Sequence, residues 1–189
     1  MNVSILFGLG NPGERYRNTR HNLGLEALEV FARRHSLTWR RGGDHHLLAR
    51  CELAGREITI LRSLTYMNDS GRALEDYGRV DPSALLVLCD DMSLPLGRLR
   101  IRPGGGSGGH LGLESVIMTL GTERFARMRL GIGAPPARID WSEFVLMPFL
   151  EEERRDAARL SESAADALER VIDEGLDRAM QEYNRKPLE

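Results

Sequence analysis

Six residues that can carry acid–base chemistry or hold a reacting group fall at loop ends or element ends: Asn11, His21, Asn22, Asn68, Asp90 and His110. Catalytic groups gather in such places, because loops held by a rigid scaffold present polar side chains to a cleft. Each residue alone has an ordinary structural explanation, since asparagine and aspartate are common turn residues and a lone histidine is usually structural. The combination is what indicates a site.

His21 is the strongest candidate for a general base. It falls in the first turn of an expected helix, where the positive end of the helix dipole favours an uncharged ring. Asp90, at the end of an apolar strand, could orient that ring and stabilise the imidazolium that forms when water is deprotonated. No serine or cysteine is well placed as a nucleophile. The residues therefore favour direct attack by water, with asparagines such as Asn11 holding the water or a carbonyl group.

The elements that must position these side chains follow from the apolar pattern. Short apolar runs predict strands, and apolar residues spaced three and four apart predict helices. Strands are expected at residues 4–7, 46–53, 57–61, 85–89, 98–102 and 127–132, and helices at residues 20–35, 67–78, 110–120 and 151–174. Strands that alternate with helices predict one α/β domain over residues 1–189, with helices on both faces of the sheet. The last helix, from about residue 151, is acidic and amphipathic, and we expect it to cover the sheet.

Two expected strands place arginines on the face opposite their apolar residues. These are Arg98, Arg100, Arg102, Arg127 and Arg129. A row of outward arginines suits phosphate groups, because phosphate contacts dominate the affinity for nucleic acids. The same row is compatible with a solvated surface that holds local salt bridges.

Two glycine motifs suggest other functions but stand in the wrong context. The run that begins at Gly8 matches the GxGxxG dinucleotide fingerprint, but Pro12 delays the helix whose N-terminus should hold the pyrophosphate. Ser107 matches the GxSxG nucleophile motif, but that fold needs the order Ser, acid, His, and no histidine follows His110. We therefore expect no nucleotide cofactor and no serine nucleophile.

Metal binding is not expected from the sequence either. His45 and His46 are adjacent, so they cannot share one face of a strand or helix as paired ligands would. Cys51 and Cys89 stand in no metal-binding spacing, and two cysteines are too few for a disulfide framework. The expected chemistry therefore needs neither a metal nor a cofactor.

The composition is that of a globular protein. Of 189 residues, 41% are hydrophobic and 29% charged, and the net charge is -2. No apolar run approaches the roughly 18 residues of a membrane span, so we expect a cytoplasmic protein that binds no membrane. We also expect it to act as a monomer. Residues 1–150 carry 19 basic and 16 acidic side chains, whereas the remaining 39 carry 7 basic and 12 acidic ones. An acidic C-terminal segment therefore masks a mildly basic body.

Four motifs, in their order and spacing, resemble the bacterial peptidyl-tRNA hydrolase family. They are GLGNPG followed by RYRNTRHNLG, then TYMNDSG, then LCDDMSLPLG, with GGGSGGHLGL. Together they cover most of the chain from Val3 to Gly133. The resemblance implies a single α/β domain with a twisted mixed β-sheet. It also implies hydrolysis of the ester between a peptide and the 3′ end of tRNA.

The same resemblance implies a role for each matching residue. His21 is the general base, Asp90 orients it, and Asn11 positions water or substrate. The positions that match the family's substrate-binding residues are Tyr16, Tyr66, Met67, Asn68, His110 and Leu111, with Arg102 and Arg129 at the positions that hold a tRNA phosphate. Met67 and Asn68 would line the peptide channel, and His110 would belong to a loop that closes over the site.

The chain departs from the family pattern at three positions. Leu111 stands where the family normally has asparagine, and leucine can hold neither water nor a substrate carbonyl by a hydrogen bond. Glu114 replaces a frequent lysine, and Ser93 replaces an aspartate. These changes leave open a lower activity or a different substrate preference.

Three functions are therefore compatible with the sequence. The first is hydrolysis of peptidyl-tRNA. The second is binding of tRNA or another RNA without hydrolysis, with Leu111 in a site kept for its shape. The third is hydrolysis of a small-molecule ester by the same base. Replacement of His21 separates the first two functions, because it should abolish hydrolysis and leave RNA binding intact. Activity that falls as the salt concentration rises would argue against the third function, because phosphate contacts weaken in salt and contacts with a small neutral ester do not.

Overall fold

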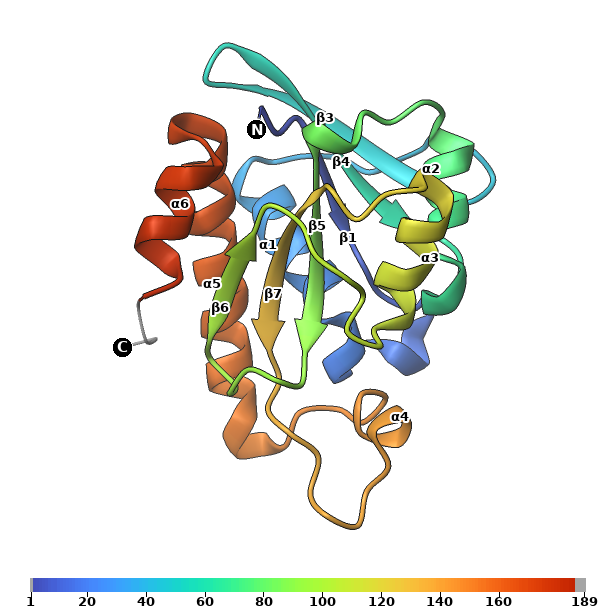
Figure 1. The fold of residues 1–189 in the computed structure, drawn as a ribbon, viewed down its shortest axis with the longest axis vertical. Helices are drawn as coiled ribbons and strands as arrows, with labels where there is room; N and C mark the ends of the chain where they lie inside the picture. The colour runs from blue at the N-terminus through green and yellow to red at the C-terminus, as the bar shows by residue number, and fades with distance from the viewer. Residues whose placement is uncertain (1, 186–189) are drawn as a thin grey trace.

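The computed structural model describes residues 2–185 and contains one seven-stranded sheet (Figure 1). The strands are β1 (Ile5–Gly8), β2 (Arg40–Arg41), β3 (His46–Leu53), β4 (Arg56–Ser63), β5 (Leu85–Asp91), β6 (Leu99–Arg102) and β7 (Ala126–Gly131). Their order in the sheet is β2-β3-β4-β1-β5-β7-β6. Strands β4, β1, β5 and β7 run parallel, while β2 with β3, β3 with β4 and β6 with β7 pair antiparallel. Residues 1 and 186–189 of the expected domain lie outside the described residues.

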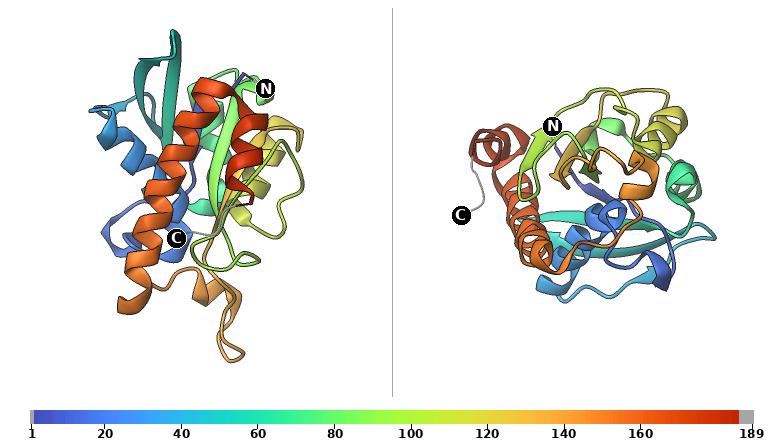
Figure 2. Two further views of the ribbon diagram at one scale, coloured as in Figure 1. Left: turned by 90° about the vertical axis from the view of Figure 1, so that its left-hand side faces the viewer. Right: turned by 90° about the horizontal axis from the view of Figure 1, so that it is seen from below.

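Helices cover both faces of this sheet, as expected (Figures 1 and 2). One face carries α1 (Leu23–Arg34), α5 (Glu151–Glu174) and α6 (Leu176–Tyr183), and the other carries α2 (Gly71–Tyr77) and α3 (Leu111–Leu120). The short helix α4 (Trp141–Phe144) lies beyond the end of the sheet at which β5 and β7 terminate. Single 3-10 turns occur at Glu14–Tyr16, Arg20–Asn22, Met67–Asp69 and Pro82–Ala84. The mixed α/β fold is thereby confirmed.

Strand β5 shows why the sheet needs two covering layers. Leu86 and Leu88 belong to the core under α1 and α5, whereas Leu85, Val87 and Cys89 belong to the core under α2 and α3. A parallel strand buried on both faces reads as a continuous apolar run, because neither set of side chains meets water. That run ends at Asp90, which places a buried carboxylate at the end of a central strand.

The close approach of α1 to β5 depends on Gly24. A Cβ added at Gly24 would lie 2.4 Å from the carbonyl oxygen of Leu88, well inside contact distance. Gly8 makes a similar approach from β1, since its Cβ would lie 3.0 Å from Leu25 Cα. Packing therefore accounts for the first glycine of the GxGxxG match. It also brings the residues before α1 against the carboxyl end of β5.

The structure corrects two predicted helix starts. The helix expected at residues 20–35 is a 3-10 turn, Arg20–Asn22, followed by α1, and the helix expected at residues 67–78 is divided in the same way. The backbone N–H groups of Arg20 and His21 donate to the carbonyls of Met147 and Val145, which hold this turn to a distant segment. Such long-range contacts override local helix propensity.

The acidic C-terminal helix covers the sheet together with α1. Arg34 of α1 pairs with Glu162 and Asp166 of α5, at the edge of their apolar contact. Helix α6, which the sequence did not predict, follows Gly175, whose φ of 89° ends α5. The side chain of Asn184 then exchanges hydrogen bonds with the backbone of Ile101 and so satisfies the edge strand β6.

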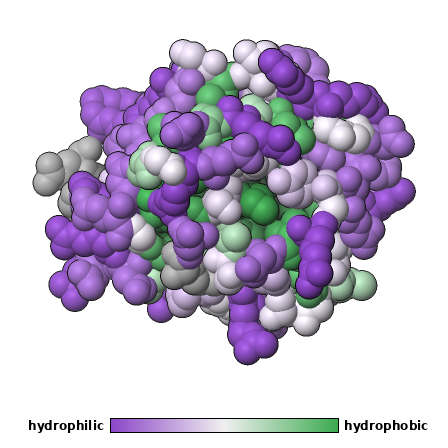
Figure 3. Space-filling view, turned by 90° about the horizontal axis from the view of Figure 1, so that it is seen from above, coloured by the Kyte–Doolittle hydropathy of each residue, from purple (hydrophilic) through white to green (hydrophobic). Residues whose placement is uncertain are grey.

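The surface at the end of the molecule opposite α4 is mostly hydrophilic, with apolar atoms showing near the middle of the view (Figure 3). Within residues 2–185, no helix is both long and apolar enough to cross a membrane.

Candidate active site

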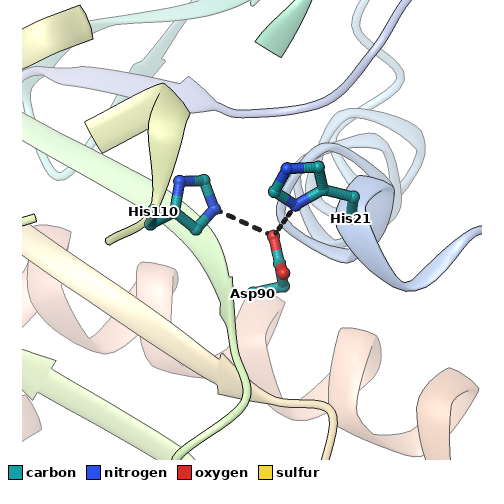
Figure 4. Close-up of side chains that lie close together, drawn as sticks. All are labelled: His21, Asp90 and His110. Atoms are coloured by element: carbon teal, nitrogen blue, oxygen red, sulfur yellow. Dashed lines mark hydrogen bonds and ion pairs between the residues drawn. The ribbon is translucent and has the colours of Figure 1, made fainter. Parts of the chain in front are cut away.

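Two histidines meet one aspartate at the carboxyl end of β5 (Figure 4). His21 Nδ1 lies 2.8 Å from Asp90 Oδ1, and His110 Nε2 lies 2.9 Å from the same oxygen. The two imidazole rings are tilted against each other, with centroids 4.9 Å apart. His21 and Asp90 are buried, and the side chain of His110 is 10% exposed. The three residues therefore form one hydrogen-bonded cluster.

Contacts on both sides fix the turn that carries His21. The His21 backbone N–H donates to the carbonyl oxygen of Val145 at 2.8 Å. The neighbouring Arg20 is buried, donates to the carbonyls of residues 147 and 148, and forms an ion pair with Glu153 at the start of α5. Because Gly24 allows α1 to touch β5, this clamped turn holds the His21 ring over Asp90.

His110 is held in one tautomer by the helix that it caps. Its Nδ1 accepts the backbone N–H groups of Gly112 and Leu113, at 3.1 and 3.2 Å. A ring nitrogen that accepts hydrogen bonds carries no proton, so neutral His110 carries its proton on Nε2. It follows that His110 donates to Asp90 and cannot exchange this role for that of a base without losing the cap of α3.

His21 presents the other ring nitrogen to Asp90: Nδ1 instead of the Nε2 that His110 uses. Burial by itself raises the pKa of the Asp90 carboxyl, but the two imidazoles outweigh burial and hold that pKa well below its usual value. An ionised carboxylate only accepts hydrogen bonds, so His21 donates from Nδ1 and keeps a lone pair on Nε2. Within the described residues, no group bonds to this Nε2. His21 is therefore arranged as a base that awaits a partner from outside the chain.

A cavity of about 490 Å³ opens beside this cluster, within the size range of small-ligand sites. Its polar wall includes the three clustered residues and Arg129. Apolar side chains make up much of the rest, among them Met92, Leu111, Leu113, Pro135, Trp141 and Val145. The glycine-rich loop contributes residues 107–109. The cavity can therefore hold a neutral group beside His21 while most of its wall excludes water.

Asn11 lies close to this cluster in the chain fold but lines a neighbouring hollow of about 720 Å³. Its Oδ1 accepts the backbone N–H of Met67 at 2.8 Å. The amide of Asn22 bonds to both the backbone N–H and the backbone carbonyl of Asn11. This leaves Nδ2 of Asn11 as its free side-chain group within residues 2–185. Asn11 can therefore donate to a substrate carbonyl, but its own oxygen is already used.

The predicted peptide-channel residues divide between two places. Asn68 lines a hollow of about 400 Å³ together with Leu111, which also lines the cavity of His21. Met67 is buried. Tyr66 is 55% exposed and meets the edge of Tyr16, with ring centroids 6.2 Å apart. Leu111 is thus the residue that joins the two hollows, and neither tyrosine lines the cavity of His21.

The two arginines predicted to hold a phosphate have different surroundings. Arg129 lines the cavity and forms an ion pair with Asp91, whereas Arg102 is exposed on the edge strand β6. Arg100 stands directly opposite Arg129 in the β6–β7 register, as Arg102 stands opposite Arg127. Like charges opposite each other across strands repel, so an anion bound here would relieve that repulsion.

The prediction that Arg127 points outward was wrong. Its guanidinium is buried, donates to the carbonyls of Gly106 and Glu123 at 2.9 and 3.0 Å, and lies over the ring of Phe125. Strand alternation gave the correct face but not the loop that covers it. Arg127 thus anchors the glycine-rich loop that leads to His110.

Comparison with known proteins gives one consistent result. The family model described as peptidyl-tRNA hydrolase matches residues 5–189. A peptidyl-tRNA hydrolase of Chloroflexus aggregans is 42% identical over 184 residues, which cover 95% of this chain and 98% of that protein. One of Thermodesulfovibrio yellowstonii is 40% identical over 96% of this chain and 98% of that protein. The chain belongs to the peptidyl-tRNA hydrolase family.

Solved structures of this family have the same fold. The crystal structure of peptidyl-tRNA hydrolase from Acinetobacter baumannii superimposes with a TM-score of 0.91, at 29% identity, over 100% of this chain and 97% of that chain. The family that the four sequence motifs resemble is therefore confirmed. A nucleotide-binding fold built on the GxGxxG match is not supported.

A metal ion is the remaining alternative for the clustered residues. One ligand atom each of His21, Asp90 and His110 lie within 4.8 Å of one another, close enough to share an ion. However, His110 could bind a metal through Nε2 only if its proton moved to Nδ1, where two backbone N–H groups of α3 point. The helix cap therefore opposes metal binding at this cluster.

Three residues that shape the site of this family member were not predicted from the sequence. Arg20 clamps the turn of His21, Val145 accepts its backbone N–H, and Trp141 lines the cavity. Val145 and Trp141 lie more than 100 residues from His21, so no local pattern links them. Only Arg20, adjacent to His21 in the motif TRHN, offered a signal.

Proposed function

We propose that this chain hydrolyses the ester that joins a peptide, or an N-blocked amino acid, to the 3′ end of tRNA, with His21 as the general base. The observation that carries the proposal is the free Nε2 of His21 beside the cavity, on a ring whose Nδ1 is held 2.8 Å from Asp90. Membership of the peptidyl-tRNA hydrolase family supplies the substrate class.

In this mechanism, a water molecule in the cavity gives a proton to His21 Nε2 as its oxygen attacks the ester carbonyl carbon. Asp90 stabilises the imidazolium that forms, since it is ionised and bonded to Nδ1. The tetrahedral intermediate then collapses, the bond to the 3′ oxygen breaks, and His21 returns its proton to that oxygen. The products are the free peptide carboxylic acid and the 3′ hydroxyl of tRNA.

Other residues would hold the two ends of the substrate. Asn11 would donate from Nδ2 to a carbonyl oxygen, because its Oδ1 is engaged by Met67. The peptide would follow the hollow of Asn68 and Leu111, near Tyr16 and Tyr66. Arg102 and Arg129 would meet phosphates of the tRNA, on the strand pair where arginines face each other.

The proposal also covers properties that remain expectations. We expect hydrolysis to need no metal ion or cofactor, and we expect the chain to act as a monomer in the cytoplasm. We expect residues 1–189 to work as one domain, in which the acidic segment from about residue 151 serves as cover for the sheet. Helix α5 begins at Glu151, which agrees with that role.

A direct test is the release of N-acetylated amino acid from N-acetyl-aminoacyl-tRNA, measured with a metal chelator present. Wild type should cleave it, and His21→Asn should retain tRNA binding while kcat falls by about 100- to 10,000-fold. Equal rates for the two proteins would refute His21 as the base. Loss of wild-type activity in the chelator would refute the metal-free mechanism.

The alternative of an RNA-binding relative without hydrolysis is not favoured. Its support was the departure at Leu111, yet His21, Asp90 and His110 form a complete hydrogen-bonded cluster beside an open cavity. Wild type that binds tRNA but releases no amino acid would revive it.

A further inference from the structure

Arg127 is a buried cation that the mechanism leaves unused. The residue lies in β7 and is 2% exposed, and its Nε is buried without a hydrogen-bond partner within residues 2–185. Arg20 is equally buried but forms an ion pair with Glu153, whereas no carboxylate of the described residues pairs with Arg127. Burial accordingly lowers the pKa of the Arg127 guanidinium below its ordinary value. An unpaired buried charge is costly, so its contacts should explain its presence.

Those contacts lie at the base of the glycine-rich loop, residues 103–109. Nη1 of the guanidinium donates to the carbonyl oxygen of Gly106 at 2.9 Å, and Nη2 donates to that of Glu123 at 3.0 Å. The Glu123 carbonyl also accepts the backbone N–H of Gly105 at 3.2 Å. The two arms of one guanidinium therefore join the loop to the segment before β7.

The part of the loop beyond this contact has little support of its own. Within the described residues, its hydrogen bonds are local, because the N–H groups of Gly109 and His110 both donate to Ser107. Gly108 and Gly109 have φ of 59° and 83°, and a Cβ on either would meet nothing within 4 Å. Yet residues 107–109 form part of the cavity wall. This wall is held at one end by the cap of α3 and at the other end by the guanidinium.

We propose that Arg127 is a positioning residue that preorganises the glycine-rich loop for substrate. It acts through the Gly106 carbonyl, and it removes freedom that residues 107–109 would otherwise lose when substrate binds. Glycine loses more backbone freedom on ordering than any other residue, so a loop with five glycines between residues 104 and 109 gains most from such a tether. The inference rests on the proposed function and adds a residue outside the cavity that sets the affinity.

The kinetic test is hydrolysis of N-acetyl-aminoacyl-tRNA by Arg127→Met, which keeps a long side chain and removes both donors. KM should rise by about 10-fold while kcat stays within about 2-fold of wild type, because lost preorganisation weakens the ground state and the transition state alike. A side chain that serves only the fold would instead lower kcat per mole of total protein, through a smaller folded fraction, and leave KM unchanged. That result, with a wild-type KM, overturns the inference.

Arg124→Met is the matched control for the lost charge. Arg124 is exposed on the segment before β7, and its side chain has no hydrogen bond or ion pair within residues 2–185. Its replacement should change KM by less than about 2-fold, as for an ordinary surface position. A rise in KM equal to that of Arg127→Met would assign both effects to the attraction between charge and tRNA, and would overturn the inference.

Backbone hydrogen exchange tests the tether even if the proposed hydrolysis fails. In Arg127→Met the N–H groups of Gly109 and His110 should exchange about 10-fold faster than in wild type, while those of β5 keep their rates, because only the loop opens. Unchanged exchange in the loop, or an equal increase throughout the fold, overturns the tether. Faster exchange confined to the loop, in a protein whose wild type hydrolyses no ester, would keep the tether and reject the proposed function.

Discussion

Two buried histidines in this molecule each hold an aspartate through Nδ1 at 2.8 Å: His21 with Asp90 and His46 with Asp76. The second pair lies at the side of the sheet, between β3 and α2. A Cβ added at Gly42 would lie 2.2 Å from His46 Nε2, so the backbone covers that nitrogen. Within residues 2–185 no hydrogen bond reaches His21 Nε2, and its ring lines the cavity.

The comparison teaches that the carboxylate orients a histidine but does not make it a base. Orientation is common to both pairs, whereas access to a reacting molecule belongs to His21 alone. The acids differ too, because Asp90 also accepts from His110 and Asp76 accepts from the backbone N–H of His45. The second donor to Asp90 is thus a side chain of the site, whereas the second donor to Asp76 is a backbone N–H group of the neighbouring loop.

The largest expected difference follows from replacing each histidine by asparagine. His21→Asn should lower kcat by about 100- to 10,000-fold, since it removes the proton acceptor. His46→Asn should leave kcat of the folded protein within about 2-fold and lower the unfolding free energy by about 1–3 kcal/mol, because it disturbs a buried hydrogen bond. Assays of hydrolysis and thermal unfolding on both variants check this. Strong loss of kcat in folded His46→Asn would contradict the comparison.

The aspartates should differ in the same sense, with a smaller effect on rate. Asp90→Asn should lower kcat by about 100-fold or more, because a neutral amide neither fixes the tautomer of His21 nor stabilises its charged form. Asp76→Asn should keep kcat and destabilise the fold. Steady-state hydrolysis by each variant, normalised to folded protein, measures the contrast. A normal kcat for Asp90→Asn would show that His21 needs no orienting acid.

The pH dependence of the unfolding free energy measures how much the ionised Asp76 carboxylate stabilises the fold. The backbone N–H of His45, and after it the contact with His46, lower the pKa of Asp76 below its ordinary value of 3.8. A lowered folded-state pKa adds stability above the ordinary pKa, and this is lost as the pH falls through the folded value. Denaturant unfolding of wild type and Asp76→Asn should therefore differ most above about pH 5 and converge below pH 3.8. A difference that grows on acidification would reverse the assigned sign.

Arg129 should affect tRNA substrates and spare small ones. Arg129→Gln should raise KM for peptidyl-tRNA by about 10-fold and reduce the slope of log affinity against log salt by about 1, as expected for one lost phosphate contact. Hydrolysis of a short ester without phosphate should change by less than 2-fold. The control Arg34→Gln removes a cation that pairs with α5 on the other face of the sheet. An equal loss on both substrates would assign Arg129 to the fold through Asp91.

Leu111→Asn should have the smallest effect. Leu111 is 41% exposed at the start of α3, so its replacement should change stability by less than about 0.5 kcal/mol. An amide at the junction of the two hollows can donate to a substrate carbonyl, and we expect kcat/KM to rise by about 2- to 5-fold. Leu146→Asn is the control, because Leu146 is 45% exposed and lines neither hollow. A fall in activity would indicate that this chain uses its apolar junction for an apolar substrate group.

The sequence alone predicted six of the seven strands and most of the residues that meet at the carboxyl end of β5, but it did not predict the short edge strand β2. The apolar run of β5 and the alternation in β6 and β7 are local patterns, and they gave these strands to within two residues. The approach of His21 to Asp90 was predicted from chain position and residue type. The structure confirms that contact, and the roles of the two side chains stay predictions.

Features that depend on distant segments were not predictable. The sequence offers no means to know that the loop near Gly106 covers Arg127, or that residues 145–148 clamp the turn of His21. The tautomer of His110 depends on the two N–H groups of α3, which become donors only once that helix exists. Local patterns specify elements, whereas these contacts arise from the way the elements pack.

The most direct test of the central claim is the ring tautomer of each histidine, measured by ¹⁵N NMR of the protein near neutral pH. The account predicts that His21 carries its proton on Nδ1 and leaves Nε2 unprotonated, and that His110 carries its proton on Nε2. Asp90→Asn should disturb the His21 signals, and Asp76→Asn should not. A proton on Nε2 of His21 would contradict the claim, because the nitrogen beside the cavity would then have no lone pair for a water proton.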